Sequence, residues 1–120
     1  LVSYGFAGVA PEVMGVGPVP STEKALRNAG LDISDIGAFE INEAFAVQVL
    51  AFLDHFGLDP ASDRINPYGG AIALGHPLGA TGTRILATLV NHLEATGGRY
   101  GLQTVCEGGG MANATIIERL

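Results

Sequence analysis

A chain of 120 residues is the size of a single domain. Its formal net charge of −6, with only six Lys and Arg side chains and no basic run, argues against the concentrated basic face that a nucleic-acid partner requires. Although 48% of the residues are hydrophobic, no uninterrupted apolar stretch reaches the roughly 20 residues that span a bilayer. We therefore expect a soluble protein with no nucleic-acid partner and no membrane span.

The cysteine content and the start of the chain give two further expectations. The single cysteine, Cys106, cannot form an internal disulfide, which fits a reducing compartment. Because no signal-peptide pattern is present, we predict a cytoplasmic location. The chain begins with LVSYGFAG, without an initiator Met and already inside an apolar segment, so we expect it to be the tail of a longer protein.

The first half of the chain predicts two strand–helix units. Residues 2–7 predict a strand and residues 8–17 a loop. Residues 18–30 predict a helix, with prolines only in its opening turn and glycine as its left-handed stop. Residues 35–41 predict a second strand. Residues 42–57 predict a helix that follows without a loop, and its apolar side chains surround the axis, as in a helix that is buried on all sides.

The second half predicts one more helix and up to three strands. Residues 64–66 favour a very short strand, and helical spacing of apolar residues predicts a helix over 79–96, ended by two glycines. Residues 99–106 and 111–120 predict two strands that pair as a hairpin. The alternation of strands and helices predicts one α/β domain with a mixed sheet.

Four positions carry groups that could take part in chemistry: Asn42, His76, Cys106 and the backbone of Gly108. Asn42 lies where a strand meets a helix, so it could equally be a helix N-cap. His76 could be a structural histidine in extended backbone before Pro77. Glycines on both sides of His76, however, indicate that backbone or ligand approaches closely there.

Cys106 has two interpretations. It could be a small apolar residue that ends a buried strand. Alternatively, the glycines of CEGGG allow a bent backbone whose N–H groups converge on an anion. A cysteine, a histidine and an asparagine at strand ends or helix starts form the pattern of a cysteine nucleophile, and ligands of open α/β sheets bind at strand ends. These residues predict a cysteine–histidine acyl-transfer site.

The remaining candidates for a site are weaker. His55 and His92 lie in the last turn and in the middle of predicted helices, and both are expected to be structural. One cysteine and three dispersed histidines show no metal-ligand spacing, so no metal is expected. The glycine-rich segments match no phosphate-binding pattern.

Three ordered segments together go beyond a generic site: NEAFA at 42–46, GGAIALGHPLGATGTR at 69–84 and CEGGGMAN at 106–113. They resemble the thiolase family, the acyl-CoA C-acyltransferases. The similarity covers essentially all 120 residues and matches the C-terminal half of that enzyme. The family fold has two similar βαβαβαββ halves stacked in αβαβα layers. The resemblance therefore implies a five-stranded mixed sheet, with the helix at 43–56 in the middle layer.

The resemblance also changes the chemistry assigned to each group. In thiolases the acylated cysteine lies in the N-terminal half, which is absent here, and the cysteine at the position of Cys106 is the acid/base. Cys106 would therefore exchange protons with the acyl-CoA α-carbon or with the CoA thiol. His76 would activate the missing nucleophile, and its ring N–H, with a water held by Asn42, would stabilise the thioester oxyanion. The Gly108 N–H would help to form a second oxyanion hole.

The same resemblance implies substrate-binding residues and partners. Met14, Ala44 and Phe45 are similar in position to residues that line the acyl and pantetheine pocket, or they are simply core residues. Coenzyme A would be a substrate, and no cofactor is expected. The partners would be the N-terminal thiolase half and further copies, in a homodimer or homotetramer. The isolated chain is not expected to turn over.

One residue departs from the family pattern, and two other functions compete. Glu107 is acidic where many relatives carry a small or apolar residue. A carboxylate there would raise the pKa of the Cys106 thiol, but only weakly, because adjacent side chains of a strand point to opposite faces. A condensing synthase of the same fold usually has histidine at both polar positions, so Asn42 with Cys106 argues against it. The other alternative is a non-catalytic α/β module that serves in assembly.

Overall fold

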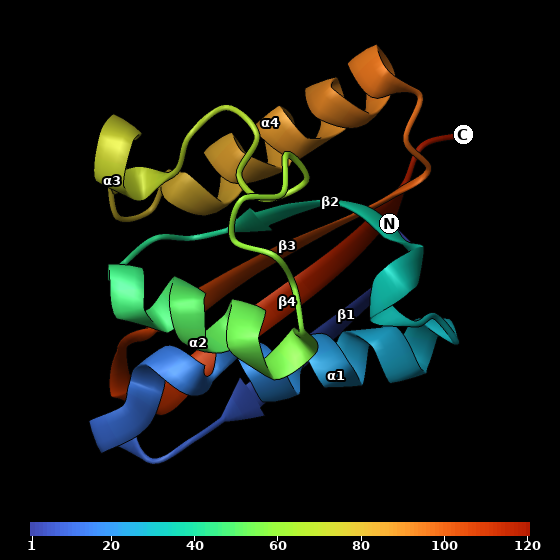
Figure 1. Cartoon of the computed structure of the whole chain (residues 1–120). Coiled ribbons are helices and arrows are strands. Elements are labelled where there is room, and N and C mark those ends of the chain that lie inside the picture. Colours follow the sequence, from blue (N-terminus) through green and yellow to red (C-terminus); the bar gives the residue numbers. More distant parts are fainter.

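The computed structural model describes all residues from 1 to 120 as one mixed sheet with helices on both faces (Figure 1). The sheet has four strands, in the order β1-β4-β3-β2: β1 (Ser3–Gly8), β2 (Ile36–Ile41), β3 (Tyr100–Glu107) and β4 (Met111–Glu118). β2 runs parallel to β3, whereas β4 is antiparallel to both β1 and β3. The mixed sheet predicted from the order of strands and helices is therefore confirmed.

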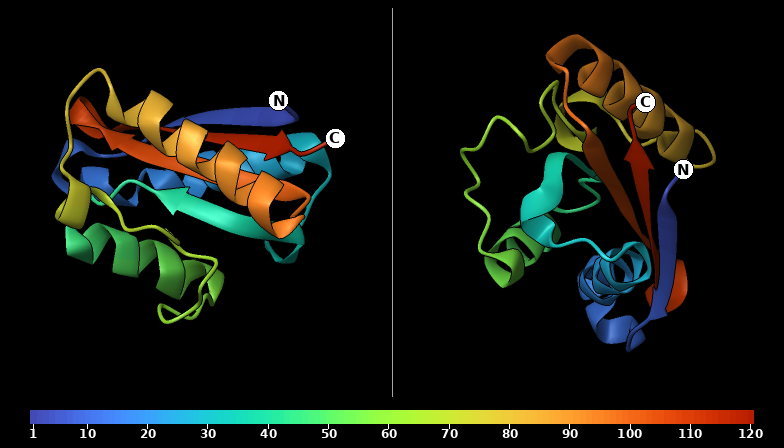
Figure 2. Two further views of the ribbon diagram at one scale, coloured as in Figure 1. Left: turned by 90° about the horizontal axis from the view of Figure 1, so that it is seen from above. Right: turned by 90° about the vertical axis from the view of Figure 1, so that its right-hand side faces the viewer.

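The helices form two unequal layers on the sheet. They are α1 (Pro18–Ala29), α2 (Ala46–Phe56), α3 (Ala71–Leu74) and α4 (Thr81–Thr96), with 3₁₀ turns at Pro11–Val16, Ile33–Asp35 and Gly108–Gly110. α1 and α2 lie together on one face of the sheet and α4 lies on the other (Figure 2). No helix combines the length and the apolar character needed to cross a membrane, and the longest, α4, has 16 residues.

The larger core lies between the sheet and the α1–α2 layer. Phe39 and Leu102 of the sheet are fully buried there against Phe52 of α2 and Ala25 of α1. Burying a large apolar side chain of this kind stabilises a fold by about 1.5–3 kcal/mol. A smaller cluster under α4 joins Leu89 and Leu93 to Ala38 of β2. Both faces of β2 are therefore covered, which fixes the position of its carboxyl end.

The predicted hairpin and the predicted helix ends are confirmed. β3 and β4 pair in antiparallel register from Tyr100↔Glu118 to Glu107↔Met111. α1 ends at Gly30 and α4 ends at Gly97, and both glycines are left-handed, with φ of 66° and 75°. Glycine adopts this conformation without the cost that a Cβ would add.

The prediction of a helix over 42–57 without a preceding loop is wrong at its start. α2 begins at Ala46, and its N-cap Phe45 is extended, with φ −146° and ψ 143°. In this chain Val47 and Leu50 are 73% and 56% exposed, so burial of this helix on all sides stays a prediction for the complete enzyme, in which it would be the middle layer. Only the face of α2 that includes Phe52 packs on the sheet. α2 shares its face of the sheet with α1, and α4 is the helix that occupies a face alone.

The five-strand count is not confirmed, because residues 64–66 do not form a strand. Ile65 makes only an isolated parallel bridge to Phe39, supported by a 2.8 Å bond from Phe39 N–H to the Arg64 carbonyl. The chain then turns at Asn66, whose φ is 44°. Pro67 follows and has no N–H to continue a ladder. In place of the expected fifth strand, residues 64–66 therefore form a single bridge to β2.

A buried carboxyl group lies in the middle of the fold. Glu40 of β2 is 1% exposed, and its Oε1 has no hydrogen-bond partner. Burial raises the pKa of Glu40 to about 7; attraction to Arg84 of α4 opposes this shift, and repulsion from Glu43 adds to it. Glu40 is therefore largely protonated in the folded chain below neutral pH.

This carboxyl predicts a pH-dependent stability difference between the natural chain and Glu40→Gln. Between about pH 4.5 and 7 the unfolded chain releases the Glu40 proton while the folded chain retains it, so stability falls as the pH rises. Relative to Glu40→Gln, the natural chain should lose on the order of 1–3 kcal/mol across this window. Urea unfolding of both proteins at pH 5 and pH 8 measures the difference. A constant difference would contradict a buried, shifted carboxyl.

Candidate active site

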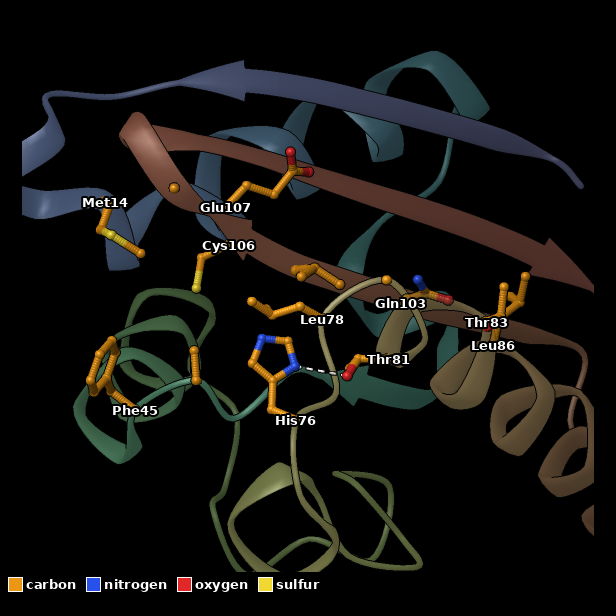
Figure 3. A pocket seen from close by; sticks show the side chains of 15 residues that line it. Met14, Phe45, His76, Leu78, Thr81, Thr83, Leu86, Gln103, Cys106 and Glu107 are labelled. Carbon is orange, nitrogen blue, oxygen red and sulfur yellow. Dashed lines mark hydrogen bonds between the residues drawn. The ribbon is translucent and has the colours of Figure 1, made fainter.

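A cavity of about 770 Å³ opens at the carboxyl ends of the two parallel strands (Figure 3). This volume is within the usual range for small-molecule sites. Fifteen residues line the cavity, and they include six of the seven site residues expected from the sequence: Met14, Ala44, Phe45, His76, Cys106 and Gly108. The seventh, Asn42, does not line the cavity, but its side chain contacts that of His76, which does. Residues up to 94 positions apart along the sequence therefore meet around one space.

Cys106 lies near the carboxyl end of β3, with its side chain toward the cavity (Figure 3). The residue is 6% exposed, and its Sγ–H donates to Gln48 Oε1 of α2 at 3.8 Å. The pKa of the Cys106 thiol is raised, mainly by burial. A hydrogen bond with the backbone of Cys106 lowers this pKa, and the Glu107 carboxylate raises it further. The thiol is therefore protonated at neutral pH and can act as a proton donor.

Glu107 affects the thiol less than burial does, as expected from its place in the strand. Its side chain is turned away from Cys106 toward the hairpin (Figure 3), where Glu107 Oε1 accepts a 2.6 Å hydrogen bond from Asn113 Nδ2. This bond crosses from β3 to β4. The carboxylate is thereby held on the outer side of the cavity mouth.

His76 is oriented by a neighbour on α4. Its Nδ1 lies 2.7 Å from Thr81 Oγ1, and the Thr81 hydroxyl donates to the Pro77 carbonyl at 3.1 Å. Because the hydroxyl has one proton, it accepts from His76 Nδ1–H, which leaves the lone pair on Nε2. A neutral imidazole in this tautomer can take up a proton at Nε2.

Asn42 lies directly beyond the end of β2. Its backbone N–H continues the ladder to the Thr104 carbonyl at 3.0 Å, and its Nδ2 lies 3.5 Å from His76 Nε2. The N-cap interpretation of Asn42 is wrong, because Phe45 is the N-cap of α2. The side chain is 1% exposed, and its Oδ1 has no partner within the chain. This oxygen is therefore a buried acceptor that no group of the chain satisfies.

The loop after Cys106 has the bent backbone that its glycines predict. Gly109 and Gly110 have φ of 78° and 84°, and a Cβ on Gly110 would overlap the Val9 carbonyl oxygen. Val9 N–H in turn donates to the Gly110 carbonyl at 2.8 Å. This close approach fixes the turn and places Gly108 on the cavity wall.

Two residues that orient the site were missed in the sequence. Gln48 and Thr81 contact the thiol and the imidazole, but neither stood out, because Gln48 lies inside an apolar helix and Thr81 inside a glycine-rich run. The other two histidines lie away from the cavity: His55 contacts Glu23, and the His92 ring packs edge-on against a tyrosine. No group of three or more His, Cys, Asp or Glu side chains has the spacing of a metal site.

The raised thiol pKa can be tested directly, because Cys106 is the only cysteine. The rate of alkylation by iodoacetamide depends on the thiolate fraction. Its midpoint should therefore lie at higher pH in the folded chain than in the chain unfolded in urea. Glu107→Gln should lower the midpoint by less than unfolding does, because burial is the larger cause. Equal midpoints for the folded and unfolded chains would contradict the assignment.

Together these features define an α/β domain with a thiol and an imidazole on one cavity at the strand ends. The family model for the thiolase C-terminal domain matches residues 1–119. The chain therefore belongs to the thiolase family. The resemblance stated from its three motifs is confirmed.

Individual relatives agree with this family. Over 110 residues, or 92% of its length, the chain is 60% identical to the steroid 3-ketoacyl-CoA thiolase FadA6 of Mycobacterium tuberculosis. This match covers 26% of the FadA6 protein. It is 52% identical over its full length to the beta-ketothiolase BktB of Cupriavidus necator, covering 30% of that protein. It is also 53% identical over 118 residues, or 98% of its length, to the acetyl-CoA acetyltransferase of Escherichia coli, covering 29% of that protein. The chain thus spans less than a third of the length of each.

Proposed function

We propose that this chain is the C-terminal catalytic domain of an acyl-CoA C-acyltransferase. The enzyme would cleave 3-oxoacyl-CoA with CoA, or condense two acyl-CoA molecules in reverse. The observation that carries the proposal is that Cys106, His76 and Gly108 line one cavity, in a chain whose relatives are named as thiolases and acetyltransferases. Neither the condensing synthase nor the assembly module accounts for the pairing of Cys106 and His76 at one cavity.

His76 would act first. Its Nε2 lone pair takes the proton of a nucleophilic cysteine that the N-terminal part of the enzyme supplies, and that thiolate attacks the 3-oxo carbonyl carbon. The imidazolium Nε2–H, with a water held by Asn42 Oδ1, then donates hydrogen bonds to the oxyanion of the departing thioester enolate. The Thr81 hydroxyl keeps the Nδ1 proton in place throughout, so that only Nε2 exchanges a proton.

Cys106 would provide the second proton transfer. When the bond between the α-carbon and the carbonyl carbon breaks, the electron pair stays on the α-carbon, and the Cys106 thiol protonates that carbon. The resulting thiolate takes the proton of an incoming CoA thiol, and the CoA sulfur attacks the acyl group on the nucleophile. The nucleophilic cysteine leaves as a thiolate and takes back the proton held on His76 Nε2. A thiol that burial keeps protonated suits the first of these two transfers.

The remaining groups would shape the acyl site. The Gly108 N–H would donate to the oxyanion that forms when CoA attacks the acyl-enzyme. Met14, Ala44 and Phe45, which line the same cavity, would contact the acyl and pantetheine chains. This chemistry requires CoA as a substrate and no further cofactor.

The larger assembly is also a proposal. On the family resemblance, the complete enzyme pairs this half with the nucleophile-bearing half and assembles as a homodimer or homotetramer. A single cysteine, free and buried, favours a reducing compartment such as the cytoplasm.

The proposal is tested by measuring thiolysis with and without the complementary half. The complete enzyme, incubated with a 3-oxoacyl-CoA and CoA, should release acyl-CoA products. The chain alone should release none, because it has no nucleophile for the acyl group. Turnover by the chain alone, or no turnover by the complete enzyme, would overturn the proposal.

A further inference from the structure

We propose that Glu43 is a positioning residue, whose carboxylate ties the loop that carries His76 to the strand end that carries Asn42. The inference rests on the proposed function of His76 and Asn42, and it adds a residue to which neither the motifs nor the cavity assigns a role. Glu43 lies outside the cavity that holds His76 and Cys106. It lines a separate surface cleft between α2 and the loop before α3, so it would not touch the substrate.

The contacts of Glu43 join three separate segments. Its Oε1 accepts a 2.9 Å hydrogen bond from Asn66 Nδ2, and its Oε2 accepts a 3.0 Å bond from the Ile72 backbone N–H in α3. Asn66 in turn brackets the end of β2: its Oδ1 accepts from Ile41 N–H at 2.8 Å, and its Nδ2 donates to the Ile41 carbonyl at 3.0 Å. One carboxylate therefore links β2, the Asn66 turn and α3.

The backbone around this carboxylate is shaped to receive it. A Cβ on Gly70 would overlap all three atoms of the Glu43 carboxyl group, so a larger residue there would displace the carboxylate from this position. Asn66 has a left-handed φ of 44°, which is unusual for a residue with a side chain and is best tolerated by asparagine or aspartate. Two local features, at positions 66 and 70, thus accompany the contacts of the Glu43 carboxylate.

The contacts of Glu43 affect the relative position of Asn42 and His76. Asn42 immediately precedes Glu43, and its backbone is fixed by the Ile41–Asn66 bonds on one side. His76 follows Ile72 by four residues, across the short helix α3 and Gly75. The contact from Asn42 Nδ2 to His76 Nε2, at 3.5 Å, closes the ring of contacts. A shift of α3 relative to β2 would therefore change the distance between these two side chains.

The charge of Glu43, and not only its size, is required by the contacts. Two N–H donors point at two different oxygens, so both must be acceptors. A carboxylate satisfies both donors, whereas a glutamine amide presents one oxygen and one NH₂ group, which would face a donor. Glu43→Gln is almost the same size and should displace either Asn66 or α3.

Three variants of the complete enzyme test the inference. Glu43→Gln should lower kcat by about 10- to 100-fold, because a misplacement of about 1 Å in a catalytic group has effects of this size. KM should stay within about twofold, since Glu43 does not contact the cavity. Glu43→Asp keeps both oxygens on a shorter side chain and should recover part of kcat. Glu23→Gln makes the same substitution on the solvent-facing side of α1, where the partly exposed Glu23 forms ion pairs with Arg27 and His55, and should leave kcat within twofold.

A spectroscopic measurement separates positioning from a general loss of stability. The side-chain amide NMR signals of Asn42 should shift in Glu43→Gln but not in Glu23→Gln, in proteins that are folded under the assay conditions. If Glu43→Gln does not fold, Glu43→Asp is measured in the same way and should show the same shift with a smaller loss of kcat.

The outcomes distinguish this inference from the proposed function. A normal kcat and unshifted Asn42 signals in Glu43→Gln, together with an inactive His76→Ala, would overturn the role of Glu43 alone. Normal activity in both variants would overturn the proposed function as well. A fall in kcat that Glu43→Asp does not relieve, with KM rising in parallel, would indicate a structural role and would also overturn the inference.

Discussion

His76→Ala should lower kcat/KM for thiolysis in the complete enzyme by about 100- to 1,000-fold, the usual loss when one oxyanion-hole donor is removed. The substitution removes both the Nε2 base and the later Nε2–H donor, while Thr81 and Asn42 remain in place. The measurement is steady-state thiolysis of a 3-oxoacyl-CoA over a range of CoA concentrations.

Two histidines outside the cavity are the matched controls for this variant. His55→Ala removes an exposed contact to Glu23, and His92→Ala removes a ring contact in α4. Both should retain activity within about twofold. Near-normal turnover in His76→Ala would rule out the proposed role of the imidazole.

Cys106→Ala should lower the rate of turnover by about 100- to 10,000-fold, the range that general acid–base catalysis contributes. The variant has no thiol to protonate the α-carbon or to accept the CoA proton. Formation of the acyl-enzyme from an acyl-CoA should persist, because the proposed function places the nucleophile in the N-terminal part of the enzyme. Intact-mass analysis of the enzyme after a single addition of acyl-CoA measures this acylation.

Val105→Ala is the control for the cysteine variant, because Val105 precedes Cys106 on the same strand and also lines the cavity. It removes apolar volume without removing an exchangeable proton, so a far smaller loss is expected. If Cys106→Ala lost acylation along with turnover, the cysteine would be the nucleophile, and the division of roles proposed here would be wrong.

Elements set by local sequence were predicted well. The helix ends at Gly30 and Gly97 follow from the ability of glycine to adopt positive φ, which depends on neighbours only. The β3–β4 hairpin follows from two apolar segments separated by a short glycine turn. In both cases the residues that decide the structure are adjacent along the chain.

Elements set by distant contacts were predicted poorly. The helical pattern of 42–57 gives no sign that Glu43 bonds to Asn66 and to α3, and those bonds keep residues 42–45 out of the helix. The short segment 64–66 has the composition of a strand, but the turn at Asn66 limits it to one bridge. Tertiary contacts outweighed local propensity at both places.

In the site, too, some residues could be predicted from the sequence and others could not. Cys106 and His76 could be singled out by residue type and by the glycines near them, and Asn42 by its place where a strand meets a helix. The partners that orient them could not, since Gln48 is 58 residues from Cys106. Thr81 is only five residues from His76, but nothing in its residue type marks it. Side-chain partners of this kind require the packed structure.

The central claim is that the Cys106 thiol exchanges protons with the carbon next to a thioester while His76 holds the enolate oxygen. Loss of the methyl-proton signal of acetyl-CoA in D₂O, followed by NMR in the complete enzyme, measures that exchange. Fast exchange in the natural enzyme, with none above background in Cys106→Ala, is the expected result. Exchange at an unchanged rate in Cys106→Ala would contradict the claim.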